Sequence, residues 1–174
     1  MLIYLIGFMG SGKTTAGKKL ARKLVYDFID LDLLIESETK ISISNFFEKF
    51  GEEKFRLIEQ QAIKKTFKLK NTVISTGGGA PCYLDNIDEI NKNGISIYLK
   101  ADIQLIVSRL QNGKDQRPLI KNKDKEELKN YISQLLPKRE TFYNRAKLVV
   151  DAKSLNIEKL ENLIESFKQI NYLG

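Results

Sequence analysis

Residues 7–14 read Gly7-Phe8-Met9-Gly10-Ser11-Gly12-Lys13-Thr14 and fit the G-x-x-x-x-G-K-[ST] pattern, in which a glycine-rich loop surrounds phosphate groups. An apolar run from Leu2 to Ile6 precedes this stretch and amphipathic spacing from Thr14 to Leu24 follows it, so we expect a strand, a loop and a helix. The glycines let successive backbone N–H groups point at one phosphate oxygen, and the helix adds its positive end. The pattern predicts nucleotide binding; the alternative is a glycine-rich turn that binds nothing.

The polar side chains of this loop have separate expected tasks. Lys13 is expected to bridge the β- and γ-phosphates of ATP, which makes it a candidate catalytic residue, and the Thr14 hydroxyl is expected to ligate Mg²⁺. The expected ATP-binding residues in and after the loop are Gly10, Ser11, Gly12, Lys13, Thr14 and Thr15.

Outward from the loop, short apolar runs alternate with amphipathic helical stretches along the whole chain. This alternation predicts an α/β fold with a parallel sheet covered by helices on both faces. A chain of 174 residues is long enough for one such domain and too short for two of ordinary size. The further strands are expected at Tyr26–Ile29, Thr72–Ile74, Ile95–Leu99 and Leu148–Val150, with helices that include Glu52–Phe67 and Ile157–Phe167.

One polar segment, about residues 111–124, has no period and contains Gly113 and Pro118. It is predicted to be a mobile loop, and loops of that length usually have a function.

The composition excludes several kinds of chemistry. The chain has no histidine, so imidazole is excluded as base or metal ligand, and proton transfer must rest on carboxylates. The one cysteine, Cys82, excludes an internal disulfide, fits a reducing compartment and is expected to be a bystander thiol.

The net charge and the hydropathy of the chain limit its possible partners and its cellular location. The net charge is +7, but the lysines are spread along the chain without a basic run, and anionic small substrates explain the excess as well as nucleic acid does. No apolar run is long enough to span a bilayer, and the apolar start lacks the basic residues of a secretion signal. We therefore expect a soluble, cytoplasmic protein without a membrane or nucleic-acid partner.

A phosphate-binding loop alone does not separate kinases from GTPases and larger ATPases. The run Asn122-Lys123-Asp124 lacks the intervening residue of the guanine-reading motif. The third apolar run ends in Ser75-Thr76-Gly77-Gly78-Gly79 instead of the acidic residue of a larger ATPase. Chain length and motif order favour a small kinase.

Five features, in the same order along the chain, resemble the shikimate kinase family. After the loop come Phe28-Ile29-Asp30-Leu31-Asp32 with Ile35-Glu36, then Phe47 with Gly51-Glu52-Glu53-Lys54-Phe55-Arg56-Leu57-Ile58-Glu59, then Ser75 to Gly79, then Arg117-Pro118-Leu119, then Arg139 with Tyr143. The resemblance implies a P-loop kinase of three α/β/α layers whose five parallel strands follow the order 2-3-1-4-5. It also implies a substrate-binding helical insert at about 32–60 and a lid at about 111–124 within one kinase domain over residues 1–174. This compact single-domain plan predicts a monomer.

Asp30 and Asp32 close the second expected strand, at the edge where open parallel sheets bind ligands, and their alternation directs them differently. The resemblance implies that Asp32 binds shikimate hydroxyls and acts as catalytic base toward the C3 hydroxyl. It implies that Asp30 holds Mg²⁺ through water and that Ser75 stands near the ion. The alternative is a pair of turn carboxylates that cap the next helix.

Arg56 and Glu59 are three residues apart on one expected helix, so their side chains can meet, as in an ordinary surface ion pair. The resemblance implies instead that Arg56 grips the substrate carboxylate, with Glu59 fixing it and Arg139 completing the clamp. Pro137, shortly before Arg139, is expected to kink or restart its helix.

The remaining expected substrate contacts are backbone and apolar. Gly77, Gly78 and Gly79 have no side chains to obstruct a ligand, and their N–H groups can close on a carboxylate; the alternative is a flexible turn. The resemblance assigns Gly78 to shikimate. Phe47 and Phe55 are expected to form the apolar wall of the pocket, or else plain core.

Two further arginines complete the expected nucleotide site. Arg117 resembles the lid arginine that closes over the ATP phosphates and stabilises transferring charge, against the alternative of a freely solvated arginine. Arg109 is expected to stack on adenine. The turn Asp151-Ala152-Lys153-Ser154-Leu155-Asn156 departs from the family's adenine-contacting turn, so backbone contacts are expected to replace side-chain ones there.

The implied function is ATP- and Mg²⁺-dependent phosphorylation of the C3 hydroxyl of shikimate, giving shikimate 3-phosphate and ADP in aromatic amino-acid biosynthesis. The alternatives are another small P-loop kinase, for gluconate or a nucleoside monophosphate, and a nucleotide-binding regulatory module without catalysis.

Overall fold

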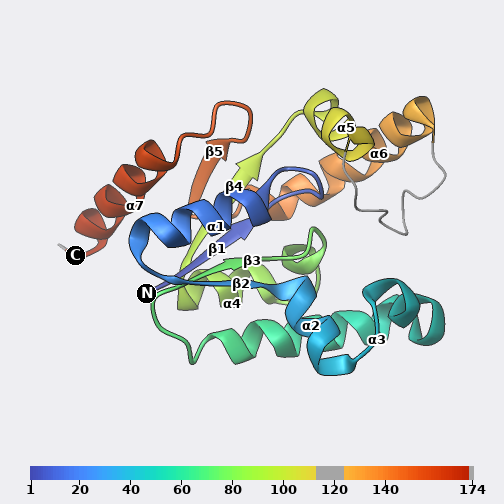
Figure 1. The fold of residues 1–174 in the computed structure, drawn as a ribbon, viewed down its shortest axis with the longest axis horizontal. Coiled ribbons are helices and arrows are strands. Elements are labelled where there is room, and N and C mark those ends of the chain that lie inside the picture. The colour runs from blue at the N-terminus through green and yellow to red at the C-terminus, as the bar shows by residue number, and fades with distance from the viewer. Residues whose placement is uncertain (113–123, 173–174) are drawn as a thin grey trace.

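The computed structural model of the chain describes residues 1–112 and 124–172, with side chains up to residue 170. Within this part the strands are β1 (Leu2–Ile6), β2 (Asp27–Asp30), β3 (Thr72–Ser75), β4 (Ile95–Lys100) and β5 (Leu148–Asp151). They form one sheet in the order β2-β3-β1-β4-β5, and every neighbouring pair is parallel (Figure 1). The predicted α/β class and strand order are confirmed.

Helices cover both faces of this sheet. The helical elements are α1 (Lys13–Leu24), α2 (Leu31–Thr39), α3 (Ile43–Thr66), the 3₁₀ turn η1 (Ala80–Cys82), α4 (Asn86–Asn93), α5 (Ile103–Asn112), α6 (Lys125–Tyr143) and α7 (Ile157–Tyr172). Because parallel crossovers are right-handed, the connection from β1 to β2 places α1 on one face and the connection from β3 to β4 places α4 on the other.

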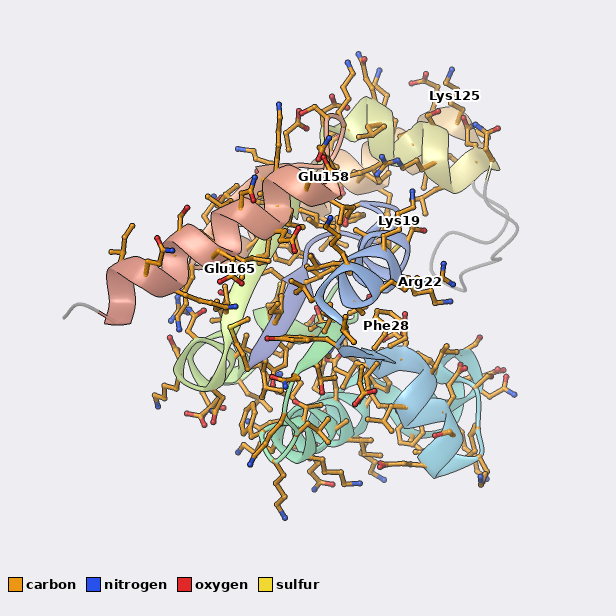
Figure 2. The ribbon with its side chains drawn as sticks, turned by 60° about the vertical axis from the view of Figure 1, so that its left-hand side comes forward. Lys19, Arg22, Phe28, Lys125, Glu158 and Glu165 are labelled. Atoms are coloured by element: carbon orange, nitrogen blue, oxygen red, sulfur yellow. The ribbon has the colours of Figure 1, made fainter. Side chains whose placement is uncertain are left out.

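The outer layer formed by α1 and α7 is charged on its exposed side. The two helices pack together, and an ion pair joins Lys23 of α1 to Glu161 of α7 at 3.6 Å. Lys19 and Arg22 extend from α1, and Glu158 and Glu165 extend from α7 (Figure 2). Basic side chains of α1 therefore lie beside acidic side chains of α7 on this solvated layer.

The sheet register brings the ends of three strands to one edge. Leu5 of β1 pairs with Ser75 of β3, and Ser75 pairs in turn with Asp30 of β2. All five residues of β1 are buried, so the loop that follows Ile6 starts from the rigid centre of the molecule. The carboxyl ends of β1, β2 and β3 thus meet where ligands bind in open parallel sheets.

α2 and α3 project from this edge as a paired unit (Figure 1). α3 contains a break at Gly51, whose φ of 80° and ψ of 169° lie in a region that is essentially restricted to glycine. The second half of α3 coincides with the helix predicted from residue 52 onward, while the first half, residues 43–50, was not predicted separately. Phe46 and Phe55 lie on either side of the break and pack with ring centroids 6.0 Å apart.

The expected restart of the helix at Pro137 is not found. α6 continues as one helix from Lys125 to Tyr143 through that residue, and Leu136 and Arg139 on either side are buried. Proline removes one hydrogen bond from the helix, and the packing of the helix's buried face compensates for that loss.

Among the residues that the structure describes, none of the helices has the length and apolar character that crossing a membrane requires. Burial raises the pKa of the Cys82 thiol to about 11, so this side chain is a protonated thiol at neutral pH, as expected for a bystander.

Candidate active site

The loop of residues 7–14 has the geometry that a phosphate cradle needs. Gly10 has a φ of 79° and Gly12 a φ of 98°, conformations in which any other residue would be strained. α1 starts at Lys13 without an acidic residue in its first turn, so its N-terminal N–H groups face the loop with their positive end uncompensated there.

Lys13 and Ser11 point into this loop. The Lys13 ammonium donates to the carbonyls of Gly7 and Phe8, at 2.9 Å and 3.0 Å, and is buried. The hydroxyl of Ser11 is buried and lacks a hydrogen-bond partner within the described part of the chain. A buried polar atom without a partner is costly, so this hydroxyl fits a group that enters the loop from outside.

Arg109 ties the loop to the turn after β5. Its guanidinium donates to the carbonyl of Ser11 at 2.7 Å and to that of Ala152 at 3.0 Å. It lies beside a cavity of about 360 Å³ that Thr15, Lys19 and Leu155 also line. The structure thus places Arg109 between the phosphate cradle and the turn in which backbone contacts to adenine were expected.

Asp30, Thr14 and Ser75 meet beside the cradle. The Thr14 hydroxyl donates to Oδ2 of Asp30 at 2.8 Å and lies 3.4 Å from the Ser75 hydroxyl. The other oxygen of Asp30 accepts from the backbone N–H of Asp32 at 3.2 Å and so caps α2. Asp30 therefore caps α2, as the alternative interpretation expected, and its second oxygen also lies beside the phosphate loop.

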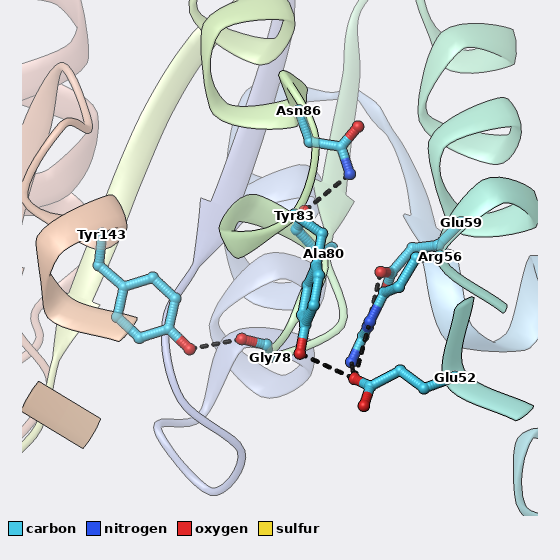
Figure 3. A network of polar contacts seen from close by, with 8 residues as sticks. All are labelled: Glu52, Arg56, Glu59, Gly78, Ala80, Tyr83, Asn86 and Tyr143. Atoms are coloured by element: carbon cyan, nitrogen blue, oxygen red, sulfur yellow. Dashed lines mark hydrogen bonds and ion pairs between the residues drawn. The ribbon is translucent and has the colours of Figure 1, made fainter. Parts of the chain in front are cut away.

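Arg56 is buried and is the centre of a charged cluster (Figure 3). Its Nη1 donates to Glu59 at 2.7 Å, while Nε and Nη2 donate to one oxygen of Glu52 at 3.2 Å and 2.7 Å. The guanidinium carbon lies 4.1 Å from the centre of the Tyr83 ring, and the Tyr83 hydroxyl donates to the same Glu52 oxygen at 2.8 Å. The surface ion-pair alternative fails for Arg56 and Glu59, since both are buried.

Glu59 is the more deeply buried of the two carboxylates on Arg56, with 1% of its side chain exposed. Burial, together with a smaller effect of the nearby Asp32 charge, raises its pKa to about 7 against the opposing effect of Arg56. Glu59 therefore changes its charge near neutral pH.

The three glycines after β3 pack closely against this charged cluster. A Cβ atom added to Gly77 would lie 2.7 Å from an oxygen of Asp32, and one added to Gly79 would lie 2.7 Å from both terminal nitrogens of Arg56. Only glycine permits so close an approach, so the turn and the charged groups form one packed surface.

Arg139 and Tyr143 reach the same turn from α6. The Tyr143 hydroxyl donates to the carbonyl of Gly78 (Figure 3). The Arg139 guanidinium carbon lies 5.3 Å from the centre of the Phe8 ring, and a Cβ added to Gly78 would lie 3.5 Å from Nη1 of Arg139. α6 therefore positions an arginine opposite Arg56 across the glycine turn.

Two cavities lie side by side at this edge. The first, of about 590 Å³, is lined by the phosphate loop with Asp30, Asp32, Ser75 and Arg109. The second, of about 90 Å³, is lined by Met9, Asp32, Ile43, Phe47, Phe55, Arg56, Glu59, Gly77, Gly78, Gly79 and Arg139. The structure thus brings together the predicted substrate-side residues, whereas Arg117 lies outside the described residues.

Two contact residues were not predicted as parts of the site. Glu52 stands four residues before Arg56, a helical spacing from which the ion pair was predictable. Tyr83 comes from the segment after η1, and only the folded chain places it over Arg56.

The comparisons with known proteins agree with this geometry. The sequence model of the family described as shikimate kinase matches residues 9–168. A shikimate kinase of Azobacteroides pseudotrichonymphae is 48% identical over 164 residues, which are 93% of this chain and 96% of the relative. The crystal structure of shikimate kinase from Bacteroides thetaiotaomicron matches with a TM-score of 0.92 at 38% identity, over 95% of this chain and 98% of that one. Shikimate kinase from Acinetobacter baumannii, solved in complex with shikimate, matches with a TM-score of 0.85 at 33% identity, over 99% of this chain and 95% of that one.

A parallel sheet of this order, with a phosphate cradle after β1 and a second cavity lined by charged side chains beside it, defines a P-loop phosphotransferase. The matches extend over nearly the whole chain, and the residues that line both cavities lie within them or next to them. The chain belongs to the shikimate kinase family. It is an ATP-dependent kinase, and its reaction is the phosphorylation of shikimate, which sets aside the gluconate, nucleoside-monophosphate and non-catalytic alternatives.

Proposed function

We propose that this chain transfers the γ-phosphoryl group of ATP to the C3 hydroxyl of shikimate across the boundary between its two cavities. The observation that carries this proposal is the place of Asp32, which lines both the cavity of the phosphate loop and the cavity of the two arginines. A carboxylate at that boundary lies within reach of a hydroxyl on one side and of a transferring phosphoryl group on the other.

In this proposal Asp32 is the general base. It accepts the proton of the acceptor hydroxyl while the oxygen attacks phosphorus, a task that a positioned carboxylate performs in the absence of histidine. Glu59, the other acid beside Gly77, is buried and ion-paired with Arg56, whereas Asp32 lines both cavities.

The phosphate side is assigned to the loop and two arginines. Lys13 leaves the carbonyls of Gly7 and Phe8 for the β- and γ-phosphates, and Ser11 and the N–H groups at the start of α1 bind phosphate oxygens. Arg117 is proposed to stabilise the charge that develops on the transferring group, and Arg109 to contact adenine. These assignments are supported by the loop geometry and by the position of Arg109 between the loop and Ala152.

The acceptor side is assigned to a carboxylate clamp. Arg56 and Arg139 flank the glycine turn, and two guanidinium groups supply the forked donors that a planar carboxylate needs. The N–H groups of Gly77, Gly78 and Gly79 add donors without side chains in the way, while Phe47 and Phe55 form the apolar wall. Glu59 holds Arg56 in place.

The oxygen atoms of Thr14, Asp30 and Ser75 fit Mg²⁺. The ion prefers a few hard oxygen ligands from the protein together with phosphate oxygens and water, and these three side chains supply hydroxyl and carboxylate oxygens within contact of one another. We propose Thr14 as the direct ligand, Asp30 as a ligand through water, and Ser75 as their neighbour. When bound, the ion neutralises charge on the phosphates.

We further propose that the enzyme works as a monomer in the cytoplasm, with residues 32–60 as the substrate-binding part and residues 111–124 as the lid of a single domain. Both sides of the candidate site come from one chain, and ATP is the phosphoryl donor. Neither nucleic acid nor a membrane takes part in the proposed reaction.

The test is Mg²⁺-dependent ADP release with shikimate, gluconate, nucleoside monophosphates or no acceptor, with the product identified by mass spectrometry. We expect stimulation by shikimate alone and a mass corresponding to one added phosphate. Tight ATP binding without shikimate turnover would refute the acceptor-side assignment and leave the phosphate loop assignment standing.

A further inference from the structure

One edge of the Arg56 guanidinium already holds a carboxylate of the protein itself. Nε and Nη2 form a fork-shaped pair of donors, and one oxygen of Glu52 accepts from both. The same oxygen accepts from the Tyr83 hydroxyl, and the Tyr83 ring lies flat enough over the guanidinium to bring its centre within 4.1 Å (Figure 3). We call this set of contacts between Glu52, Arg56 and Tyr83 the Glu52 latch.

The two carboxylates on Arg56 differ in how firmly they are held. Glu59 is buried, with 1% of its side chain exposed, so its carboxylate is held inside the cluster. The side chain of Glu52 is 51% exposed, so the carboxylate returns to water when it leaves Arg56. An exposed ion pair is worth little because water screens it and solvates both partners. Glu52 is therefore the partner of Arg56 that can be displaced.

The charges of the cluster favour such a displacement. Among the described residues, the guanidinium groups of Arg56 and Arg139 already face the acidic side chains of Asp32, Glu52 and Glu59. A substrate carboxylate would add one more acidic group unless one of these left. Like charges at close range oppose binding, and the exposed Glu52 is the one able to leave.

The backbone around Glu52 permits this movement. Glu52 directly follows Gly51, where α3 breaks at a φ of 80°, and within the described part of the chain nothing lies within 4 Å of a Cβ added to Gly51. The cavity assigned to the acceptor is about 90 Å³, below the roughly 300 Å³ at which ligand pockets usually begin, so movement of a neighbouring side chain would favour binding of a ring-shaped acid.

We propose that Glu52 is an internal competitor for the Arg56 guanidinium, which the acceptor carboxylate must displace before it is clamped. Glu52 thereby sets the affinity for the acceptor without touching it. The proposal rests on the assignment of Arg56 to the acceptor carboxylate made above. Glu52 is a positioning residue in this scheme, because it acts through Arg56.

The experiment compares Glu52→Gln with Glu53→Gln. Both variants remove one negative charge from the same turn of α3, but Glu53 is exposed and has no recorded contact with Arg56 among the described residues. The dissociation constant for shikimate is measured by calorimetry without nucleotide, and KM and kcat are measured with saturating Mg²⁺ and ATP. Thermal unfolding of each variant checks that it is folded.

We expect Glu52→Gln to bind shikimate about 2- to 5-fold more tightly than wild type, the range that corresponds to loss of one exposed ion pair, with an unchanged KM for ATP. Glu53→Gln should match wild type. Tyr83→Phe keeps the ring over Arg56 and removes only the hydroxyl that donates to Glu52, so it should tighten shikimate binding by a smaller factor.

The outcomes separate this proposal from the function on which it rests. If wild type neither binds nor turns over shikimate, the acceptor assignment fails and the latch fails with it. If wild type turns over shikimate but Glu52→Gln binds it no more tightly than Glu53→Gln, only the latch is overturned. Weaker binding by Glu52→Gln would show that Glu52 supports Arg56 in the bound state, which also overturns the proposal.

Discussion

At the scale of single residues, substitution of Asp32, the proposed general base, is expected to have the largest effect on catalysis. Asp32→Asn keeps the size and hydrogen-bonding capacity of the side chain and removes the basic carboxylate. We expect kcat with shikimate to fall by about 10²- to 10⁴-fold, while the affinity for ATP stays near that of wild type. Steady-state kinetics and nucleotide titration measure the two quantities, and a near-normal kcat would remove Asp32 from the base role.

Arg56 is expected to act on acceptor binding. Arg56→Ala deletes charged hydrogen bonds worth about 1.5–3 kcal/mol, so we expect the KM for shikimate to rise by about 10- to 100-fold with little change for ATP. Arg56→Lys keeps the positive charge but lacks the paired guanidinium donors, so its KM for shikimate should lie between those of wild type and Arg56→Ala. An unchanged KM for shikimate combined with weakened ATP binding would contradict the clamp.

Glu59 links the stability of the protein to pH. Its pKa is raised from about 4.5 to about 7 by burial, so the folded state binds its proton more tightly than the unfolded state does. The stabilising contribution of the protonated acid is complete below pH 4.5 and is lost as pH rises through 7, a change on the order of 3 kcal/mol. Denaturant unfolding at several pH values measures it.

Glu59→Gln is the control for that pH dependence, because the amide does not titrate. Its free energy of unfolding should change less between pH 5 and pH 8 than that of wild type. Equal slopes for the two proteins would assign the pH dependence to other groups.

At the scale of elements, the break in α3 is the feature most open to a direct test. The conformation of Gly51 belongs to a region that is nearly closed to other residues, so Gly51→Ala should destabilise the protein by about 1–3 kcal/mol or straighten the helix. Because the break precedes Glu52 and Arg56, we also expect the KM for shikimate to change more than the KM for ATP. Glu53→Ala, in a regular part of the same helix, should show neither effect.

The elements also show what the sequence is able to predict. The fully buried β1 and the amphipathic α1 have strong periods, and both begin and end within one residue of the predicted bounds. The first half of α3 was not separated from its surroundings, since Gly51 interrupts the period and the aromatic residues on both sides of it pack across the break. At Pro137 the expected restart of the helix is absent, because burial of Leu136 and Arg139 on either side outweighs one lost hydrogen bond, while the expected kink stays a prediction.

The site was predictable where its members lie close in sequence or match the family's motifs. Arg56 and Glu59 share a helix face, and their ion pair is present at 2.7 Å. Tyr83 was missed because its place over Arg56 depends on how the segment after η1 packs against α3, which spacing along the chain does not record.

At the scale of the whole molecule, both halves of the candidate site belong to one chain. If the enzyme works as a monomer, a mixture of Asp32→Asn and Arg56→Ala should show no more activity than the sum of the two variants alone. Specific activity should likewise be independent of enzyme concentration. Recovery of activity in the mixture would show that residues from two chains combine in one site.

The register between β1, β2 and β3 has a consequence for how the protein gains its activity during folding. Asp30 reaches Thr14 and Ser75 only after Leu5 has paired with Ser75, two residues separated by most of the first half of the chain. Such long-range pairings form slowly compared with local helices. In a refolding experiment, helical circular dichroism should therefore return before the ability to bind ATP, and nucleotide binding should report on completion of the sheet.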